Sequence, residues 1–277
     1  MTVTVTPLGP TTGVEISGLS GSALVERSVA DECLAALEQY GVVVYREAAV
    51  EDDDLVAFSR LLGDVVPLPM GAHEHREIQR ITRDASKSKL AAYREATFFW
   101  HIDGTTDEVP NRATLLTARQ VTDDGTGDTE FANTYAAYAA LPEADRARLE
   151  SLRVVHSFAA SQSLVHPDPS PHERAAWDRV PSREHPLVWT RRSGRRSLLI
   201  GSTAGAVTGL PDEEGRAVLE HLHAWSTQPR FTVRHRWRVG DLVVWDNTGM
   251  LHRAQPYGEG SARLMHRTSL AGTEAIR

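Results

Sequence analysis

Phe98-Phe99-Trp100-His101-Ile102-Asp103-Gly104 is the stretch on which the interpretation of the whole chain depends. Side chains two positions apart on a strand point to the same side of a sheet, so a strand here aims His101 and Asp103 at one point. An imidazole nitrogen and a carboxylate oxygen supply two of the three protein ligands of a two-histidine, one-carboxylate Fe(II) site. A strand-end ion pair is the alternative, so the iron interpretation needs a second histidine and an anion site downstream.

A candidate for the second histidine lies near the end of the chain. The apolar run Leu242–Trp245 leads through an Asp-Asn turn into a short stretch that carries His252. In a jelly roll, strands distant in sequence lie side by side, so His252 can reach the pocket of His101 and Asp103. A histidine without metal is the alternative. Three protein ligands would leave coordination positions open, as oxygen chemistry requires.

Two arginines follow in the stretch Arg263-Leu264-Met265-His266-Arg267. On a strand, Arg263 and Arg267 share one face, and His266 points to the other. Guanidinium groups on an inward face are costly unless anions meet them, and arginine suits bidentate binding of carboxylates. We therefore expect two anionic guests, with one carboxylate on Arg263 and another acidic group on Arg267. Ion pairs with acids elsewhere in the chain are the alternative.

The composition is that of an ordinary globular protein. The 277 residues are 41% hydrophobic and 24% charged, and the formal net charge is −7. Because no basic surplus exists to neutralise phosphates, we expect no nucleic-acid partner. No apolar stretch approaches a membrane span, and no signal peptide is expected at the N-terminus. The single cysteine, Cys33, allows no disulfide within the chain and favours a cytoplasmic location.

The residue patterns predict a mainly β protein with flanking helices. Apolar residues recur at helical spacing over 30–40, 55–62 and 213–225. Elsewhere, many short β-branched or alternating runs are separated by turn residues, which is typical of an antiparallel sandwich or barrel of the jelly-roll kind.

Two irregular, polar segments interrupt this pattern, and we expect active-site loops at 84–98 and 159–182. Long irregular segments in a compact domain are often functional loops or lids. His73 and His75, two positions apart just upstream, can also bind a metal. We interpret them instead as solvated or substrate-facing residues, and we assign His73 to the substrate.

Together, these motifs resemble the taurine dioxygenase-like (TauD/TfdA) family of Fe(II)- and 2-oxoglutarate-dependent dioxygenases. The resemblance spans nearly the whole chain and rests on His101-Ile102-Asp103, Gly127-Asp128-Thr129, Val244-Trp245-Asp246-Asn247, His252-Arg253-Ala254 and the stretch from Arg263 to Arg267. It implies a double-stranded β-helix, a cupin-like jelly roll, in a single domain over residues 1–277. Dimers and tetramers are common in such proteins, so a homo-oligomer is an open option.

The resemblance also implies roles for the matching positions. His101, Asp103 and His252 would be the iron ligands and the catalytic centre. Thr129 and Arg263 would bind 2-oxoglutarate, with Arg263 on its distal carboxylate. Fe(II), 2-oxoglutarate and O2 would then hydroxylate or otherwise oxidise an aliphatic C–H bond, with release of succinate and CO2.

The residues expected to line the substrate pocket differ from those that a taurine site requires. Arg267 matches the position that meets the sulfonate in the taurine enzyme, but residues 96–99 are more apolar than a taurine site needs. This favours a larger, partly hydrophobic organic acid, with Phe98 and Phe99 lining its pocket. Ordinary core packing is the alternative for these two rings. The stretch 252–257 resembles members that act on organic carboxylates, such as phenoxyalkanoate dioxygenases.

Other functions stay open from the sequence. A member of the same family can act on a sulfonate or a sulfate ester. A metal-dependent hydrolase can use the same three ligands with a bound water, but it needs a general base and gives Arg263 no role. A jelly roll that only binds or regulates is a further alternative.

Overall fold

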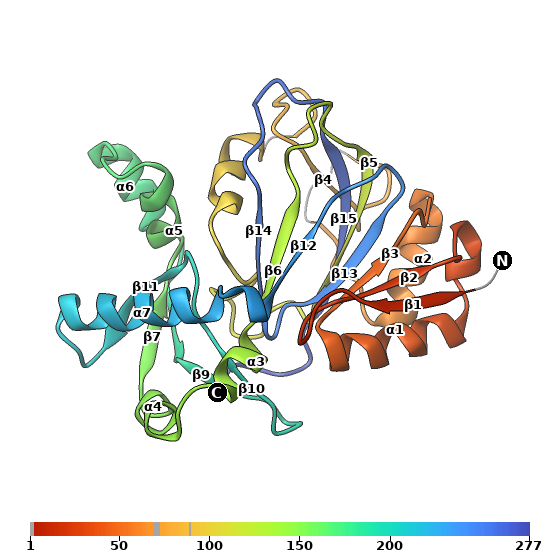
Figure 1. The fold of residues 1–277 in the computed structure, drawn as a ribbon. Coiled ribbons are helices and arrows are strands. Elements are labelled where there is room, and N and C mark those ends of the chain that lie inside the picture. The colour runs from red at the N-terminus through yellow and green to blue at the C-terminus, as the bar shows by residue number, and fades with distance from the viewer. Residues whose placement is uncertain (1–2, 69–72, 89) are drawn as a thin grey trace.

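The computed structural model describes residues 3–68, 73–88 and 90–277, and its centre consists of two facing sheets (Figure 1). The larger sheet has the strand order β1 (Thr4–Pro7), β2 (Val14–Ser17), β3 (Val42–Tyr45), β13 (Leu242–Asp246), β5 (Ala113–Gln120), β15 (Leu264–Leu270), β4 (Gln79–Ile81). The smaller sheet has the order β12 (Thr232–His235), β6 (Thr129–Asn133), β14 (Met250–Ala254). This jelly-roll core with flanking helices confirms the predicted fold class.

Side chains on successive strand residues point to opposite faces, which explains why the larger sheet packs against other elements on both of its faces. In β3, Val42 and Val44 belong to the core between the two sheets, together with Phe131 of β6. Val43 and Tyr45 point the other way, against α1 (Arg27–Tyr40) and α2 (Asp52–Leu62). Successive strand residues face opposite sides, so a strand apolar on both faces is buried between two layers.

A second group of elements lies at the left of Figure 1 and has its own apolar core around Leu187, Trp189, Leu198 and Leu222. Its strands are β7 (Arg153–His156), β8 (Arg183–Pro186), β9 (Val188–Thr190), β10 (Arg196–Leu198) and β11 (Ala204–Thr208). Its helices are α3 (Thr134–Ala139), α4 (Glu143–Leu149), α5 (Phe158–Val165), α6 (Pro171–Trp177) and α7 (Asp212–Ser226). The helices predicted over 30–40, 55–62 and 213–225 are therefore confirmed as α1, α2 and α7.

The two predicted loops are largely helical, which corrects that part of the sequence analysis. Segment 84–98 contains the 3₁₀ helix η2 (Ala91–Phe98), and segment 159–182 contains most of α5 and all of α6. Ser170 starts α6 with a capping box, because its hydroxyl accepts from the Glu173 N–H and the Glu173 carboxylate accepts from the Ser170 N–H. The two other 3₁₀ helices described are η1 (Gly21–Leu24) and η3 (Pro229–Phe231).

The stretch 98–104 is also not the regular strand that the sequence suggested. Phe98 ends η2, His101 forms an isolated β-bridge, and Asp103 lies in a turn. Gly104 has φ +79°, and a Cβ there would lie 3.1 Å from Pro110, so this turn requires glycine.

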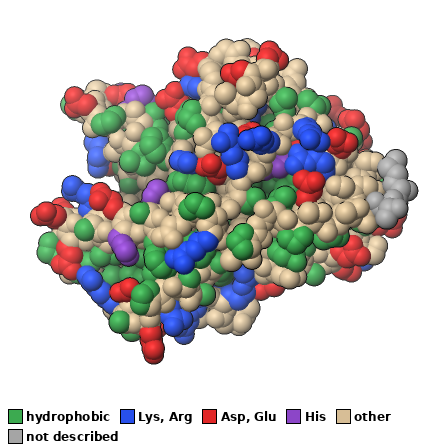
Figure 2. Space-filling view, viewed as in Figure 1, with side chains coloured by type: hydrophobic (Ala, Val, Ile, Leu, Met, Phe, Trp, Pro, Cys, Tyr) green, Lys and Arg blue, Asp and Glu red, His purple; other side chains and the backbone are tan. Residues whose placement is uncertain are grey.

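The surface carries no single dominant charge on the face drawn in Figure 2, where acidic and basic side chains are interspersed. Across the described ranges, none of the helices has the length and apolar composition needed to cross a bilayer.

Candidate active site

Main-chain hydrogen bonds join the two predicted histidine ligands. The N–H of His101 donates to the carbonyl of His252 over 3.0 Å, and the N–H of His252 donates to the carbonyl of His101 over 2.8 Å. His252 lies on β14, opposite Phe131 of β6. Gly201 packs against the same bridge, where a Cβ would lie 2.9 Å from the carbonyl oxygen of Trp100. The backbone therefore fixes both histidines before any side-chain contact is considered.

Both imidazole rings are oriented by their Nδ1 atoms. Nδ1 of His101 lies 2.9 Å from the carbonyl oxygen of Phe99, and Nδ1 of His252 lies 3.3 Å from that of Met250. A carbonyl only accepts, so each Nδ1 carries the proton and each Nε2 offers a lone pair. Ligand histidines are commonly oriented in this way.

Asp103 completes the cluster with its two oxygens placed differently. Oδ1 lies 3.9 Å from Nε2 of His101, and Oδ2 lies 3.6 Å from Nε2 of His252. Oδ2 also lies 3.0 Å from the guanidinium of Arg267 and accepts from the hydroxyl of Thr114 over 3.3 Å. Oδ1 has no hydrogen bond within the described residues. The ligand atoms of His101, Asp103 and His252 all lie within 4.8 Å of one another, as a shared cation requires.

Ionisation states also suit a cation. Burial, and then the neighbouring His252, lower the pKa of His101 to about 4, so this ring is neutral at neutral pH. Burial opposes ionisation of Asp103, but Arg267 and the two histidines hold the pKa of this carboxyl well below its usual range. The cluster thus offers a neutral imidazole at His101 and a carboxylate at Asp103.

Arg263 is a buried guanidinium that has no acidic partner among the residues the structure describes. It is 3% exposed, and its guanidinium lies 4.8 Å from the centroid of the Tyr257 ring. Asp128, the nearby acid, pairs instead with Arg234 over 2.7 Å. Burial lowers the pKa of Arg263, and Tyr257 and Asp128 act in the opposite direction. An unpaired buried guanidinium is costly unless an anion meets it.

Thr129 is buried at the start of β6, where its hydroxyl accepts from the indole N–H of Trp237 over 2.9 Å. Its own hydroxyl hydrogen is therefore free for an acceptor. Gly127, two residues earlier, has φ +78°, and a Cβ there would lie 3.0 Å from Cδ of Arg263. The Gly-Asp-Thr turn thus leaves room for the arginine.

The predicted substrate residues are only partly brought together. Arg267 reaches Asp103, as described. Phe98 packs edge-on to Tyr257 at 5.6 Å between ring centroids, and Phe99 is 37% exposed. His73 instead contacts Asp52 and His266, on the face of β15 opposite Arg267, so its placement does not support the predicted substrate role.

The sequence analysis did not single out Trp237, Tyr257 or Arg94, all of which the structure brings near these groups. No local motif identifies them, because their roles come from contacts between distant segments.

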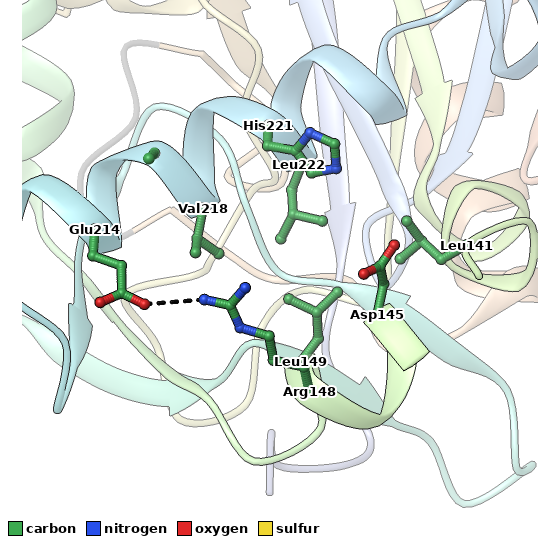
Figure 3. A pocket seen from close by; sticks show the side chains of 9 residues that line it. Leu141, Asp145, Arg148, Leu149, Glu214, Val218, His221 and Leu222 are labelled. Atoms are coloured by element: carbon green, nitrogen blue, oxygen red, sulfur yellow. Dashed lines mark hydrogen bonds and ion pairs between the residues drawn. The ribbon is translucent and has the colours of Figure 1, made fainter. Parts of the chain in front are cut away.

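A hollow of about 240 Å³ lies between α4 and α7, outside this cluster (Figure 3). Leu149, Val218 and Leu222 line it, and Arg148 pairs with Glu214 across it over 3.0 Å. It holds none of the predicted site residues and is therefore not the candidate active site.

Known proteins similar to this chain include 2-oxoglutarate-dependent dioxygenases. The chain is 32% identical to an alpha-ketoglutarate-dependent 2,4-dichlorophenoxyacetate dioxygenase of Cupriavidus pinatubonensis, with 97% of this chain and 98% of that protein covered. It is 31% identical to an alpha-ketoglutarate-dependent sulfate ester dioxygenase of Pseudomonas putida, with 96% and 88% covered.

A solved structure is similar over the whole chain. The crystal structure of AAD-2 in complex with Mn(II) and N-oxalylglycine superposes with a TM-score of 0.82 at 29% identity, and the match covers 100% of both chains. Residues 4–269 match the family described as taurine catabolism dioxygenase TauD, TfdA family. The chain belongs to this TauD/TfdA dioxygenase family.

Proposed function

We propose that this protein is an Fe(II)- and 2-oxoglutarate-dependent dioxygenase that hydroxylates, or otherwise oxidises, an aliphatic C–H bond of a small to medium organic acid. One observation carries the proposal: the ligand atoms of His101, Asp103 and His252 lie within 4.8 Å of one another, and each imidazole has its Nδ1 turned to a backbone carbonyl. Two imidazoles and one carboxylate suit Fe(II) and leave coordination positions open. The family's dioxygenases point to the same chemistry.

The residues divide the work between three ligands and two anion sites. His101, Asp103 and His252 would hold Fe(II), which when bound would supply the oxidising chemistry with O2 and release succinate and CO2 from 2-oxoglutarate. Arg263 binds the distal carboxylate of 2-oxoglutarate with paired N–H donors. Thr129 donates its free hydroxyl hydrogen to the same carboxylate, because its oxygen already accepts from Trp237.

On the substrate side, Arg267 binds the acidic group, and Phe98 and Phe99 line an apolar wall. A carboxylic acid is the first candidate because a 2,4-dichlorophenoxyacetate dioxygenase is among the relatives. A sulfate ester is the second, because the sulfate ester dioxygenase is similar to nearly the same degree.

Anaerobic titration with Fe(II) and 2-oxoglutarate tests this function. We expect a weak visible charge-transfer band, and release of succinate once O2 and a substrate acid are added. Tight binding of Zn(II), with no such band and no succinate, would support the metal-dependent hydrolase instead.

We also propose that residues 1–277 act as one domain, since the family match spans 4–269. A cytoplasmic location is supported by the buried, reduced Cys33. A homo-oligomer stays a prediction, which light scattering of the purified protein checks.

A further inference from the structure

Arg94, on η2, carries a buried positive charge that no acidic residue of the chain neutralises. The residue is 8% exposed, and its Nε has no hydrogen-bond partner in the described ranges. Its Nη2 donates to the carbonyl of Arg80 over 3.5 Å. The described ranges include every Asp and Glu of the chain, and none of them lies within 4.0 Å of the Arg94 guanidinium. Such a group is costly unless an anion meets it.

The contact with Arg80 places this guanidinium beside the strand that carries Arg267. Arg80 lies on β4 opposite His266 of β15, and the next pair is Gln79 with Arg267. Burial, and then the charge of Arg267, lower the pKa of Arg94 to about 10, while Asp103 acts in the opposite direction. The Arg94 guanidinium is therefore within electrostatic reach of Arg267 and of the proposed iron ligand Asp103, which Arg267 contacts over 3.0 Å.

The donors of these two arginines are not equally available. Arg267 lies 3.0 Å from Oδ2 of Asp103, and its Nε and Nη2 each donate to the hydroxyl of Ser269 over 3.3 Å. Arg94 has no comparable partner. The charges of Fe(II) and 2-oxoglutarate cancel each other, so the three arginines 94, 263 and 267 exceed Asp103 by two positive charges. The occupied pocket therefore still lacks negative charge.

We propose that Arg94 is a second substrate-binding arginine, and that Arg94 and Arg267 together hold the oxyanionic group of the primary substrate. This rests on the proposed dioxygenase function and narrows the substrate class. The acidic group must be ionised and must offer at least two free oxygens, as a carboxylate or a sulfate does. Neutral alcohols, amides and carboxylic esters are excluded.

Binding without turnover tests the proposal. Calorimetry measures the affinity of 4-chlorophenoxyacetate and of hexyl sulfate for the protein loaded with Mn(II) and N-oxalylglycine, with 4-chlorophenoxyethanol and 1-hexanol as uncharged controls. Arg94→Gln should weaken binding of the acid that the wild type binds on the order of 30-fold, the usual effect of one charge-assisted contact. Arg94→Lys should keep part of the affinity for the acid, because it retains the positive charge. The two acids distinguish a carboxylate from a sulfate.

Matched measurements separate a binding role from a structural one. Arg80→Gln removes the same charge from a side chain that lines a different hollow, beside His73 and His266, and should leave acid binding unchanged. Arg94→Gln should keep or raise the unfolding midpoint, because it removes an unpaired buried charge.

Several results would overturn the proposal. These are equal acid affinity of Arg94→Gln and wild type, a loss of N-oxalylglycine affinity in Arg94→Gln, and failure of both acids to bind the wild type. Failure of the proposed dioxygenase function has a separate sign, the absence of the Fe(II)–2-oxoglutarate band in the wild type.

Discussion

Two clusters in this molecule have the same composition, two histidines and one aspartate, but different surroundings. One is His101, Asp103 and His252, and the other is Asp52, His73 and His266. In both, the potential ligand atoms lie within 4.8 Å of one another. Composition and proximity alone therefore do not distinguish a metal site from a structural ion-pair network.

The difference lies in how the carboxylate is used. Oδ1 of Asp52 lies 2.7 Å from Nδ1 of His266 and also pairs with Arg119, and Oδ2 lies 3.1 Å from Nε2 of His73. Because Arg119 already pairs with the Asp52 carboxylate, a resident cation of the chain neutralises the acid of this cluster. The partners of Asp103 gather on Oδ2 and leave Oδ1 open. We therefore expect one metal ion per chain, bound at the first cluster.

The strongest test exchanges one carboxylate in each cluster. Asp103→Ala should abolish stoichiometric Fe(II) binding and reduce turnover by at least about 1,000-fold, because the metal supplies several kcal/mol of catalysis. Folding should stay nearly normal. Asp52→Asn should keep one Fe(II) per chain and lower the unfolding temperature instead. Metal analysis, turnover and thermal unfolding check both variants, and loss of iron from Asp52→Asn would reverse our assignment.

A second test concerns the arginines that distinguish the surroundings of the first cluster. Arg263→Ala should raise the Michaelis constant for 2-oxoglutarate by about 100-fold, as expected for loss of a bidentate charged contact, with a much smaller effect on substrate. Arg267→Ala should do the reverse. Steady-state kinetics with both substrates measures this, and our division of the anions is wrong if both variants weaken 2-oxoglutarate alone.

A smaller effect is expected when the space between Gly127 and the Arg263 side chain is filled. Gly127→Ala should raise the Michaelis constant for 2-oxoglutarate by roughly 10-fold, since a Cβ would meet Arg263 and the left-handed backbone adds strain of about 1–2 kcal/mol. Gly125→Ala is the matched control, because Gly125 also has positive φ (+70°) but a Cβ there meets nothing within 4 Å. Equal effects in the two variants would show that strain, not contact with Arg263, is responsible.

The smallest effect concerns pH and the second cluster. Burial lowers the pKa of His73 and of His266, although Asp52 partly opposes this. The folded state therefore favours the neutral rings, and this stability is complete above the unfolded pKa of about 6.5 and is lost as the pH falls toward the folded values. Unfolding temperatures between pH 7 and pH 5 should decline less in a His73→Gln/His266→Gln variant than in wild type. An equal decline of the unfolding temperature in both proteins would show that these two histidines do not contribute to the pH dependence of stability.

Sequence patterns predicted the parts of this molecule that local chemistry decides. The buried run of β13 and the helical spacing of α1 need no distant partner to be recognised. The capping box at Ser170 and Glu173 was also a readable signal for α6, but the polar composition around it favoured a loop.

Long-range contacts decide the rest. The rings of His73 and His266 are in contact although they lie 193 positions apart in the sequence. Arg94 is buried without an ion-pair partner because of the segments that surround it in the fold. Neither relation has a local sequence signal. The candidate ligands could be predicted from the sequence because their motifs resemble those of a known family. The metal role of His101, Asp103 and His252 is a proposal that measurement of bound iron tests.

The paired main-chain hydrogen bonds between His101 and His252 separate two properties of this enzyme. The spacing of the two imidazoles is set by backbone N–H and C=O groups, which every amino acid except proline supplies, and not by the side chains proposed to contact the substrate. Substrate preference can therefore be redesigned through η2 while the spacing of the two proposed iron ligands is inherited unchanged. Variants selected for new acids should accordingly change their acid specificity long before they lose the metal.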